Sequence, residues 1–211
     1  MNRLYHGVAN WSWAMRDFVF HALGRQFVPN SFTKFLIIDR LRRDTGASAF
    51  IESGTFHGVT ARRCASAFAR VWTIELDRDL ATRATQSLSD LANIRVLQGD
   101  VLERLPDIFD DPAATDAIVY LDGHFSGDGT ARGSQAEPAV EALSVLARYL
   151  GRIKAVIIDD FRTFGVEPGF PLKSELLASI ERHFPEDQYD WTLDWDQVHL
   201  VRRRAPRGTR R

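Results

Sequence analysis

Residues 49–60 read AFIESGTFHGVT, and this segment carries the strongest structural signal in the sequence. A short apolar run ends at Glu52, glycines follow at Gly54 and Gly58, and a helix-forming segment begins at Thr60. Glycine adopts backbone angles that other residues avoid, so Gly54 suits a tight turn, and Gly58 lets the backbone approach a ligand or pack close to the strand. The pattern predicts a strand, a tight turn and a helix, an arrangement that suits a nucleotide-like ligand.

A second acidic residue follows at a spacing that fits a ribose. Residues 71–75, VWTIE, form another apolar run, which ends at Glu75. In nucleotide-binding α/β proteins, an acid about 20 residues beyond the glycine turn accepts hydrogen bonds from the ribose hydroxyls. Glu52 and Glu75 together are a more specific signal than either residue alone.

Apolar runs alternate with helical patterns from residue 48 onward. Continuously apolar strands separated by helices are typical of a parallel sheet covered on both faces, and right-handed crossovers make the sheet doubly wound. Residues 194–197 alone join the last two runs, so we expect the sheet to end in an antiparallel hairpin. We therefore predict an α/β fold with a doubly wound, mostly parallel, seven-stranded Rossmann-like sheet. The predicted strands are 49–52, 71–75, 94–98, 117–122, 155–159, 191–193 and 198–201, and the predicted helices are 60–69, 78–91, 102–109, 135–150 and 171–184.

Two segments flank this alternating domain, which spans residues 48–202. Residues 1–47 form an aromatic-rich helical leader, expected as two helices with a break and an N-cap at the sequence PNS, residues 29–31. The leader packs on the sheet, packs on a second subunit, or acts as a substrate lid. Residues 203–211 form a basic tail that is expected to be disordered and solvated, with contact to phosphate or RNA as the alternative.

The composition is that of one globular α/β domain. Apolar residues make up 45% and charged residues 26% of the 211 residues. No stretch of about 18 apolar residues is present to span a bilayer. The formal net charge of −1 argues against the broad basic surface of a nucleic-acid binder. Cys64 is the single cysteine, so no internal disulfide can form, and we expect a cytoplasmic protein in which Cys64 is a packed side chain and not a nucleophile.

Acidic residues end or follow five of the predicted strands. In an open α/β sheet, ligands bind at the carboxyl ends of the strands, near the point where the strand order reverses. A dinucleotide fingerprint needs glycine where Phe56 and Val59 stand, and a carboxylate would repel a pyrophosphate. A rim of carboxylates instead favours a ligand that carries positive charge. The acids are Glu52, Glu75, Asp100, Asp122 and the pair Asp159 and Asp160.

The spacing E-x-G-x-x-x-G of residues 52–58 resembles the first motif of class I S-adenosylmethionine-dependent methyltransferases, and the resemblance covers residues 48–200. It implies that Glu52 faces the cationic methionyl part of the cofactor and that Glu75 binds the ribose. It also implies that Asp100, in the sequence QGDV, meets the adenine amino group. The implied cofactor-binding residues are Glu52, Ser53, Gly54, Thr55, Phe56, Gly58, Glu75, Leu76, Gly99, Asp100, Val101 and Asp122.

The sequences YLDGH, residues 120–124, and IIDDF, residues 157–161, resemble strand ends of metal-dependent O-methyltransferases of the catechol, caffeoyl-CoA and macrocin types. This resemblance implies that Asp122, Asp159 and Asp160 hold Mg²⁺, for which carboxylate oxygens are suitable ligands. The ion would lower the pKa of a bound hydroxyl and align its oxygen with the sulfonium methyl. In the alternative interpretation, Asp159 caps a loop and Asp160 is solvated, because metal-free members also carry acids at these strand ends.

The sequence departs from the catechol type at the general base. That family has a lysine three residues after its first metal-binding aspartate, and this chain has Phe125 there. The catalytic residues expected here are Asp122 and His124, with His124 as the base because an ordinary histidine pKa of about 6.5 suits that role. Alternatively, His124 hydrogen-bonds its own loop. The segment 125–133 is expected to shape or close the acceptor pocket, where Arg132 and Arg162 clamp an anionic acceptor or are merely solvated.

The sequence thus predicts an S-adenosylmethionine-dependent enzyme that transfers a methyl group to a hydroxyl of a small molecule, with Mg²⁺ as a second cofactor. The alternatives are a metal-independent small-molecule O- or N-methyltransferase and a cofactor-binding protein without turnover. Phe56 and Val59 disfavour an NAD-dependent oxidoreductase. The expected partners are the small-molecule acceptor and, through the aromatic leader, a second copy of the chain, with no membrane and no nucleic acid.

Overall fold

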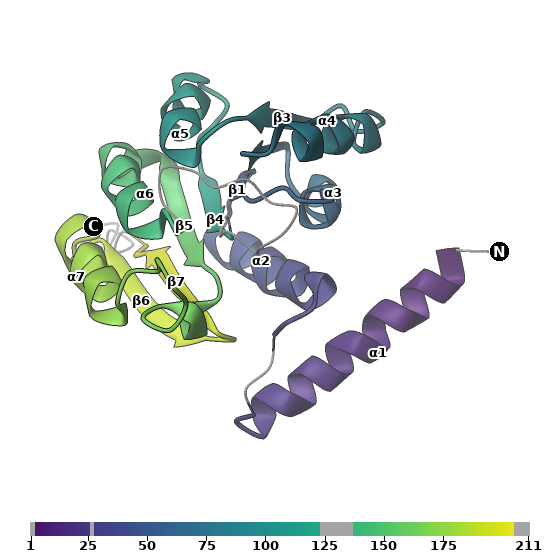
Figure 1. Ribbon diagram of the computed structural model, residues 1–211, viewed down its shortest axis with the longest axis horizontal. Helices are drawn as coiled ribbons and strands as arrows, with labels where there is room; N and C mark the ends of the chain where they lie inside the picture. Colours follow the sequence, from purple (N-terminus) through teal and green to yellow (C-terminus); the bar gives the residue numbers. More distant parts are fainter. Residues whose placement is uncertain (1–2, 26–27, 123–136, 205–211) are drawn as a thin grey trace, which may run out of the picture.

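A seven-stranded sheet forms the centre of the protein, as the sequence predicts. The computed structural model describes residues 3–25, 28–122 and 137–204, with the side chains of residues 3–9 left out. The strands run in the order β3-β2-β1-β4-β5-β7-β6 (Figure 1). The first five pair in parallel, and β7 pairs antiparallel with both β5 and β6, which confirms the predicted fold class. The strands are β1 (Ala49–Ser53), β2 (Arg70–Glu75), β3 (Ile94–Gln98), β4 (Ala117–Leu121), β5 (Ile153–Ile158), β6 (Tyr189–Asp194) and β7 (Gln197–Arg202).

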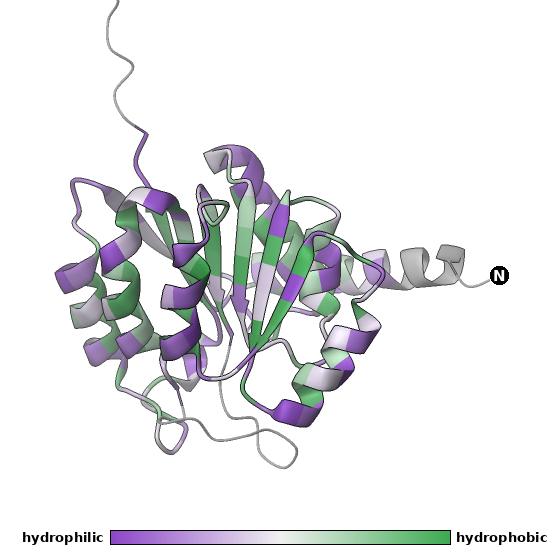
Figure 2. Cartoon of the chain, turned by 90° about the horizontal axis from the view of Figure 1, so that it is seen from above, coloured by the Kyte–Doolittle hydropathy of each residue, from purple (hydrophilic) through white to green (hydrophobic). Residues whose placement is uncertain are grey.

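Helices cover both faces of this sheet (Figure 1). The core on one face joins the sheet to α2, α3 and the α4 segment, and the core on the other face joins it to α5, α6 and α7. Figure 2 shows hydrophobic residues concentrated in the central strands, between helices that carry both hydrophilic and hydrophobic residues. None of the helices within the described ranges is long and apolar enough to cross a bilayer. The helices are α1 (Arg3–Ala22), α2 (Ser31–Thr45), α3 (Val59–Ala65), α4 (Arg78–Ser87), α5 (Val101–Asp110), α6 (Ala139–Leu146) and α7 (Lys173–His183), with 3₁₀ turns η1 (Ala147–Arg152) and η2 (Phe161–Thr163).

Some predicted helix boundaries differ from those observed. The helix after the glycine turn is shorter than predicted and begins one residue earlier, because Gly58 occupies its N-cap position with a left-handed φ of 69°. The helix predicted over 135–150 becomes α6 followed by the 3₁₀ turn η1, in which Tyr149 leaves helical geometry, and residues 135–136 lie outside the described range. These ends depend on cap geometry, which a periodic pattern does not encode.

The final hairpin has a tighter turn than the predicted link of residues 194–197. Trp195 and Asp196 alone connect β6 to β7, and both have positive φ, at 57° and 61°. Two consecutive positive φ values are typical of a type I′ turn, whose twist matches that of the paired strands. Asp196 also binds the chain after β5, because its carbonyl oxygen accepts a hydrogen bond from Phe161 N at 2.9 Å.

The leader forms two helices, as predicted, and Asn30 supplies the predicted N-cap by accepting hydrogen bonds from Phe32 N and Thr33 N. In Figure 1, α1 extends away from the sheet and meets the rest of the chain near α2. Its attachment is polar, because the buried Asp17 carboxylate accepts hydrogen bonds from Asn30 N at 2.9 Å and Thr33 Oγ1 at 2.7 Å. The His21 ring adds a stacking contact with the hairpin residue Trp195, at 3.9 Å between ring centroids.

Candidate functional site

The predicted acids lie in a row along one edge of the sheet, here called the acid rim: Asp100, Glu75, Glu52, Asp122 and Asp159, in spatial order. Backbone hydrogen bonds fix this order by linking each strand end to the next. Gly99 N bonds to Glu75 O at 2.9 Å, Gly54 N to Ile74 O at 3.0 Å, Asp122 N to Ser53 O at 3.2 Å, and Asp159 N to Leu121 O at 3.0 Å. The strand order reverses between β1 and β4, and Glu52 and Asp122 lie at the ends of these two neighbouring strands.

The glycine turn after β1 is held by its backbone geometry. Gly54 has φ 89°, as predicted for a turn closed to other residues, and Phe56 also has a positive φ, of 48°. Phe56 N donates to Glu75 Oε2 at 2.8 Å, which ties the turn to the next strand. A Cβ on Gly58 would lie 2.9 Å from Leu88 Cδ1, so Gly58 allows close packing on the segment after α4 and not on the strand.

Glu52 is buried at the end of β1, at 2% exposure, and shares a small polar network with two threonines. Thr73 Oγ1 donates to Glu52 Oε2 at 2.6 Å, and the Thr55 and Thr73 hydroxyls lie 2.6 Å apart. Burial raises the pKa of Glu52 to about 8, although the Thr73 hydrogen bond and the Lys34 charge oppose this. The carboxyl group therefore holds a proton at neutral pH until a cation lies against it.

Glu75 and Asp100 lie at the β2–β3 end of the acid rim. Glu75 is buried, and its second oxygen, Oε1, accepts a hydrogen bond from Asp77 N at 3.0 Å. Each carboxylate oxygen has two lone pairs, so a ligand hydroxyl can donate to the same oxygens. Asp100 is the N-cap of α5 and accepts from Leu102 N at 2.9 Å. The predicted Leu76, Gly99 and Val101 lie beside these acids, at the ends of β2 and β3 and the start of α5.

Asp122, Asp159 and Asp160 form a cluster beyond β4 and β5, in which one carboxylate oxygen from each lies within 4.8 Å of the others. Asp159 is fully engaged. Its Oδ1 accepts from Gln197 Nε2 at 3.1 Å and from Asp160 N at 2.9 Å, and its Oδ2 accepts from the Tyr120 hydroxyl.

A residue that sequence reasoning missed lies between two of these aspartates. Lys34 Nζ is 2.9 Å from Asp122 Oδ2 and 2.5 Å from Asp159 Oδ2. Burial lowers the pKa of Lys34, but the Asp159 and Asp122 charges outweigh burial, so the pKa lies above its ordinary value and the side chain is an ammonium. Burial raises the pKa of Asp159, but the Lys34 charge and the hydrogen bonds from Lys34, Tyr120 and Gln197 together outweigh burial and leave that pKa below its usual value. The pKa of Asp122 is raised by burial and by the neighbouring Asp159 charge.

The comparisons with known proteins agree with this architecture. An O-methyltransferase of Bacillus cereus, solved with S-adenosylhomocysteine, matches with a TM-score of 0.60 and 17% identity over 90% of this chain and 91% of that chain. The O-methyltransferase TomG of Streptomyces achromogenes, involved in tomaymycin synthesis and solved with S-adenosylmethionine, matches with a TM-score of 0.55 and 20% identity over 92% of this chain and 90% of that chain. A Klebsiella pneumoniae protein assigned as an O-methyltransferase matches with a TM-score of 0.61 and 19% identity over 92% of this chain and 90% of that chain.

The fold is that of class I methyltransferases. No family model and no curated protein matches the sequence. In this fold the acid rim has two halves. One half consists of the glycine turn with Glu52 and Glu75, at the ends of β1 and β2, and the other consists of the cluster of Asp122, Asp159 and Asp160, just after β4 and β5.

The remaining residues predicted for the acceptor side of the site are Arg162, His124, Arg132 and the segment 125–133. Arg162 is partly exposed and is engaged within the chain, since its guanidinium contacts Asp196 and lies 2.6 Å from Asp160 Oδ1. His124, the segment 125–133 and Arg132 lie outside the described residues. Glu137 is a further buried acid that sequence reasoning missed, and burial raises its pKa to about 7.

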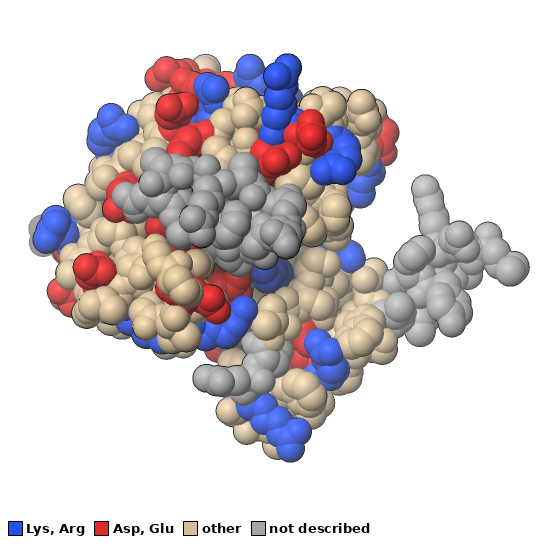
Figure 3. Space-filling model, in the orientation of Figure 1, with Lys and Arg blue, Asp and Glu red and all other residues tan. Residues whose placement is uncertain are grey.

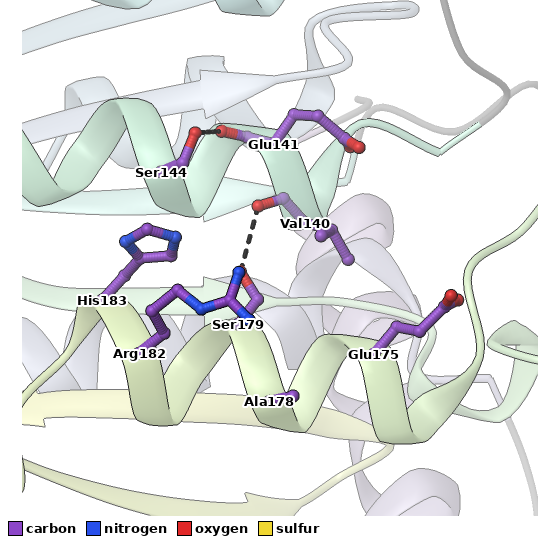
Figure 4. A pocket seen from close by; sticks show the side chains of 8 residues that line it. All are labelled: Val140, Glu141, Ser144, Glu175, Ala178, Ser179, Arg182 and His183. Carbon is purple, nitrogen blue, oxygen red and sulfur yellow. Dashed lines mark hydrogen bonds between the residues drawn. The ribbon is translucent and has the colours of Figure 1, made fainter.

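Lysines and arginines are interspersed with acids on the face seen in Figure 3, without one continuous basic area. Figure 4 shows a cavity of about 350 Å³ between α6 and α7, on the helical layer. None of the predicted site residues lines this cavity, so we place the candidate site at the acid rim. The lining residues are Val140, Glu141, Ser144, Glu175, Ala178, Ser179, Arg182 and His183.

Proposed function

We propose that this protein is an S-adenosylmethionine-dependent methyltransferase that methylates a hydroxyl of a small molecule. One observation carries the proposal: Glu52 and Glu75 end adjacent strands beside the glycine turn, in a fold whose solved neighbours include complexes with S-adenosylmethionine and S-adenosylhomocysteine. A small-molecule acceptor is supported by solved neighbours that include O-methyltransferases, one of them involved in tomaymycin synthesis, and by the lack of a continuous basic surface on the face of Figure 3.

The cofactor would bind along the β1–β2–β3 half of the acid rim. Glu52 faces the cationic methionyl group, and ionisation of Glu52 on binding provides a carboxylate for that charge. Glu75 accepts hydrogen bonds from the ribose, and Asp100 lies nearest the adenine. The turn residues Ser53, Gly54, Thr55, Phe56 and Gly58, with Leu76, Gly99, Val101 and Asp122, complete the predicted cofactor site.

Methyl transfer is a single in-line displacement. The bond between the methyl carbon and the sulfonium sulfur breaks as the acceptor oxygen bonds to that carbon, and neutral S-adenosylhomocysteine leaves. The hydroxyl proton passes to a base, for which His124 is the predicted residue, and Asp122 is the second predicted catalytic residue. Asp122 lies beside the switch point, next to the carboxyl end of β1, so it is placed between the cofactor half and the acceptor half of the rim.

The predicted Mg²⁺ site does not fit the carboxylates as they are arranged. Asp122, Asp159 and Asp160 have the hard oxygen donors that Mg²⁺ takes, and the ion would supply Lewis-acid activation of the acceptor hydroxyl. However, the ammonium of Lys34 lies between Asp122 and Asp159, and it contacts an oxygen of each. This observation favours the metal-independent alternative, and the Mg²⁺ site stays a prediction of the sequence.

Calorimetric titration tests the proposed cofactor. We expect S-adenosylhomocysteine to bind with one site per chain and NADH not to bind, because Phe56 and Val59 stand where a dinucleotide-binding turn needs glycine. A Glu75→Ala variant should weaken S-adenosylhomocysteine binding by roughly 10- to 100-fold, since it removes charge-assisted hydrogen bonds to the ribose. Binding without methylated product across catechols, glycosides and CoA esters would instead support a non-catalytic cofactor-binding protein. No binding would refute the proposal.

For the organisation around this site we propose what the sequence predicts. We propose a leader over 1–47, a methyltransferase domain over 48–202 and a basic tail over 203–211, in a cytoplasmic protein. A homodimer is the proposed assembly, because α1 exposes large apolar side chains whose exposed fractions reach 64%. The exposed set on α1 is Trp11, Trp13, Met15, Phe18 and Val19.

A further inference from the structure

Lys34 lies on the apolar face of a helix, where a core side chain is expected. In α2, positions 34, 37, 38 and 41 share one face, and the other three are isoleucine or leucine. A cation in the first turn of a helix is also opposed by the helix dipole. Neither the helix nor the core explains a lysine here, so its position must be stabilised by the groups that its ammonium contacts.

Those groups are the two aspartates that a divalent cation would need. The ammonium lies 2.9 Å from Asp122 Oδ2 and 2.5 Å from Asp159 Oδ2, and the Lys34 side chain is only 13% exposed. A carboxylate offers about four lone-pair sites. On Asp159 these four receive Lys34, the Tyr120 hydroxyl, Gln197 Nε2 and Asp160 N. A metal can therefore reach Asp159 only when one of these donors leaves.

Of the four donors, Lys34 is the one able to leave. Tyr120 and Gln197 are completely buried, and the Asp160 amide belongs to the backbone. The lysine stem is flexible, and Asp122, its other partner, has a side chain that is 20% exposed. Asp160 is also engaged by a cation of the chain, since Arg162 lies 2.6 Å from its Oδ1.

We propose that the Lys34 ammonium is the resident cation of the Asp122–Asp159–Asp160 cluster, and that it excludes a divalent metal from it. Lys34 then positions the acceptor half of the site without a metal, with two of its three N–H groups directed at Asp122 and Asp159. The third is available to donate to the acceptor oxygen as that oxygen reacts. The catalytic part of this inference rests on the proposed function, whereas the exclusion of metal does not.

Titration of the full-length protein with Mn²⁺, followed by electron paramagnetic resonance of the free ion, tests the exclusion. Mn²⁺ prefers the same oxygen ligands as Mg²⁺. The wild-type chain should bind no stoichiometric Mn²⁺ up to about 1 mM, the weak limit of ordinary binding constants. Lys34→Met should bind one Mn²⁺ at least about 100-fold more tightly, because a cation no longer lies between the carboxylates. Lys34→Arg, which keeps the charge, should stay as weak as the wild type.

Lys154→Met is the matched control. Lys154, in β5, pairs with Asp116, just before β4, at a distance of 3.1 Å. This pair lies at the opposite end of the two strands from the aspartate cluster, so the loss of Lys154 should leave Mn²⁺ binding unchanged. Tight one-to-one binding of Mn²⁺ by the wild type would overturn the proposal. So would a folded Lys34→Met protein that gains no affinity. If Lys34→Met does not fold, the wild-type and Lys34→Arg titrations decide alone, with weak binding by both as support and tight binding by either as refutation.

A separate measurement distinguishes failure of the Lys34 inference from failure of the proposed methyltransferase function. S-adenosylhomocysteine binding is measured in the same wild-type sample. Failure of the nucleoside to bind refutes the methyltransferase proposal and leaves the Mn²⁺ result intact, whereas tight Mn²⁺ binding refutes the role of Lys34 and leaves the cofactor result intact.

Discussion

Glu52 is buried at the carboxyl end of a central strand, where an ionised carboxylate lacks water. Its pKa of about 8 is above the ordinary 4.5, so the folded chain binds a proton there that the unfolded chain releases between those values. The free energy of unfolding therefore falls as pH rises from about 4.5 to about 8. The full penalty for an ionised Glu52 is on the order of a few kcal/mol.

Replacement of Glu52 should separate stability from ligand binding. Glu52→Gln removes the ionisation, so the cofactor-free variant should lose that part of the pH dependence and melt at a higher temperature than the wild type at pH 8, in thermal unfolding scans. S-adenosylhomocysteine should bind the variant roughly 10- to 100-fold more weakly by calorimetry, since the charge facing the ligand ammonium is gone.

The same titration has a signature in the wild type. Because the proton must leave Glu52 before a carboxylate faces the ligand, affinity for S-adenosylhomocysteine should increase between pH 6 and the pKa of about 8, by up to about tenfold per pH unit. In Glu52→Gln this increase should disappear. An equally steep increase in both proteins would assign it to another group.

At the scale of elements, α3 approaches the end of α4 through Gly58. Gly58→Ala should lower the free energy of unfolding by roughly 2–4 kcal/mol in urea titrations, because the new Cβ combines a left-handed φ with a contact to Leu88. Gly46→Ala is a matched control, because Gly46 has φ 71° and open space around it, so it should show the backbone penalty of about 1–2 kcal/mol alone.

A double variant isolates the contact itself. Leu88→Ala removes the side chain that the new Cβ would meet, so the combined Gly58→Ala and Leu88→Ala variant should lose less stability than the sum of the two single variants. Leu88→Ala combined with Gly46→Ala should be additive. Additive losses in both double variants would show that Gly58 serves only its backbone angle.

The sequence was sufficient to predict a doubly wound, mostly parallel sheet with a final antiparallel pair, and acids gathered at one edge of it, because the carboxyl ends of parallel strands meet at one edge whatever the packing details. The order of the strands comes from the structure alone. It was insufficient for Lys34. The apolar spacing of α2 at positions 34, 37, 38 and 41 does contain a signal, since a lysine on an apolar face needs a partner. That partner lies 88 residues later, and only the docked position of α2 identifies it. The hydrogen bonds of Tyr120 and Gln197 to Asp159 were not predicted either, because in the sequence each looks like an ordinary strand residue.

At the scale of the whole molecule, α1 is joined to the domain by a polar contact. Asp17→Ala should lower local stability by roughly 1–3 kcal/mol, because the Asn30 amide and the Thr33 hydroxyl lose their acceptor. Hydrogen exchange should therefore become faster in α1 and in the first turn of α2, while the sheet and the affinity for S-adenosylhomocysteine stay unchanged. Asp44→Ala is the control, since the exposed Asp44 forms a pair with Arg40 on the surface of α2 and should change exchange little.

The position of Lys34 also has a consequence for the order in which a nascent chain becomes structured. The lysine leaves the ribosome before Asp122 and Asp159, and a lone ammonium is costly to bury. We therefore expect the first turn of α2 to dock only after β4 and β5 have been synthesised and have joined the growing sheet. Until then, the aromatic leader is not docked on a folded domain. During this interval a chaperone would have the largest area of exposed apolar side chains to bind.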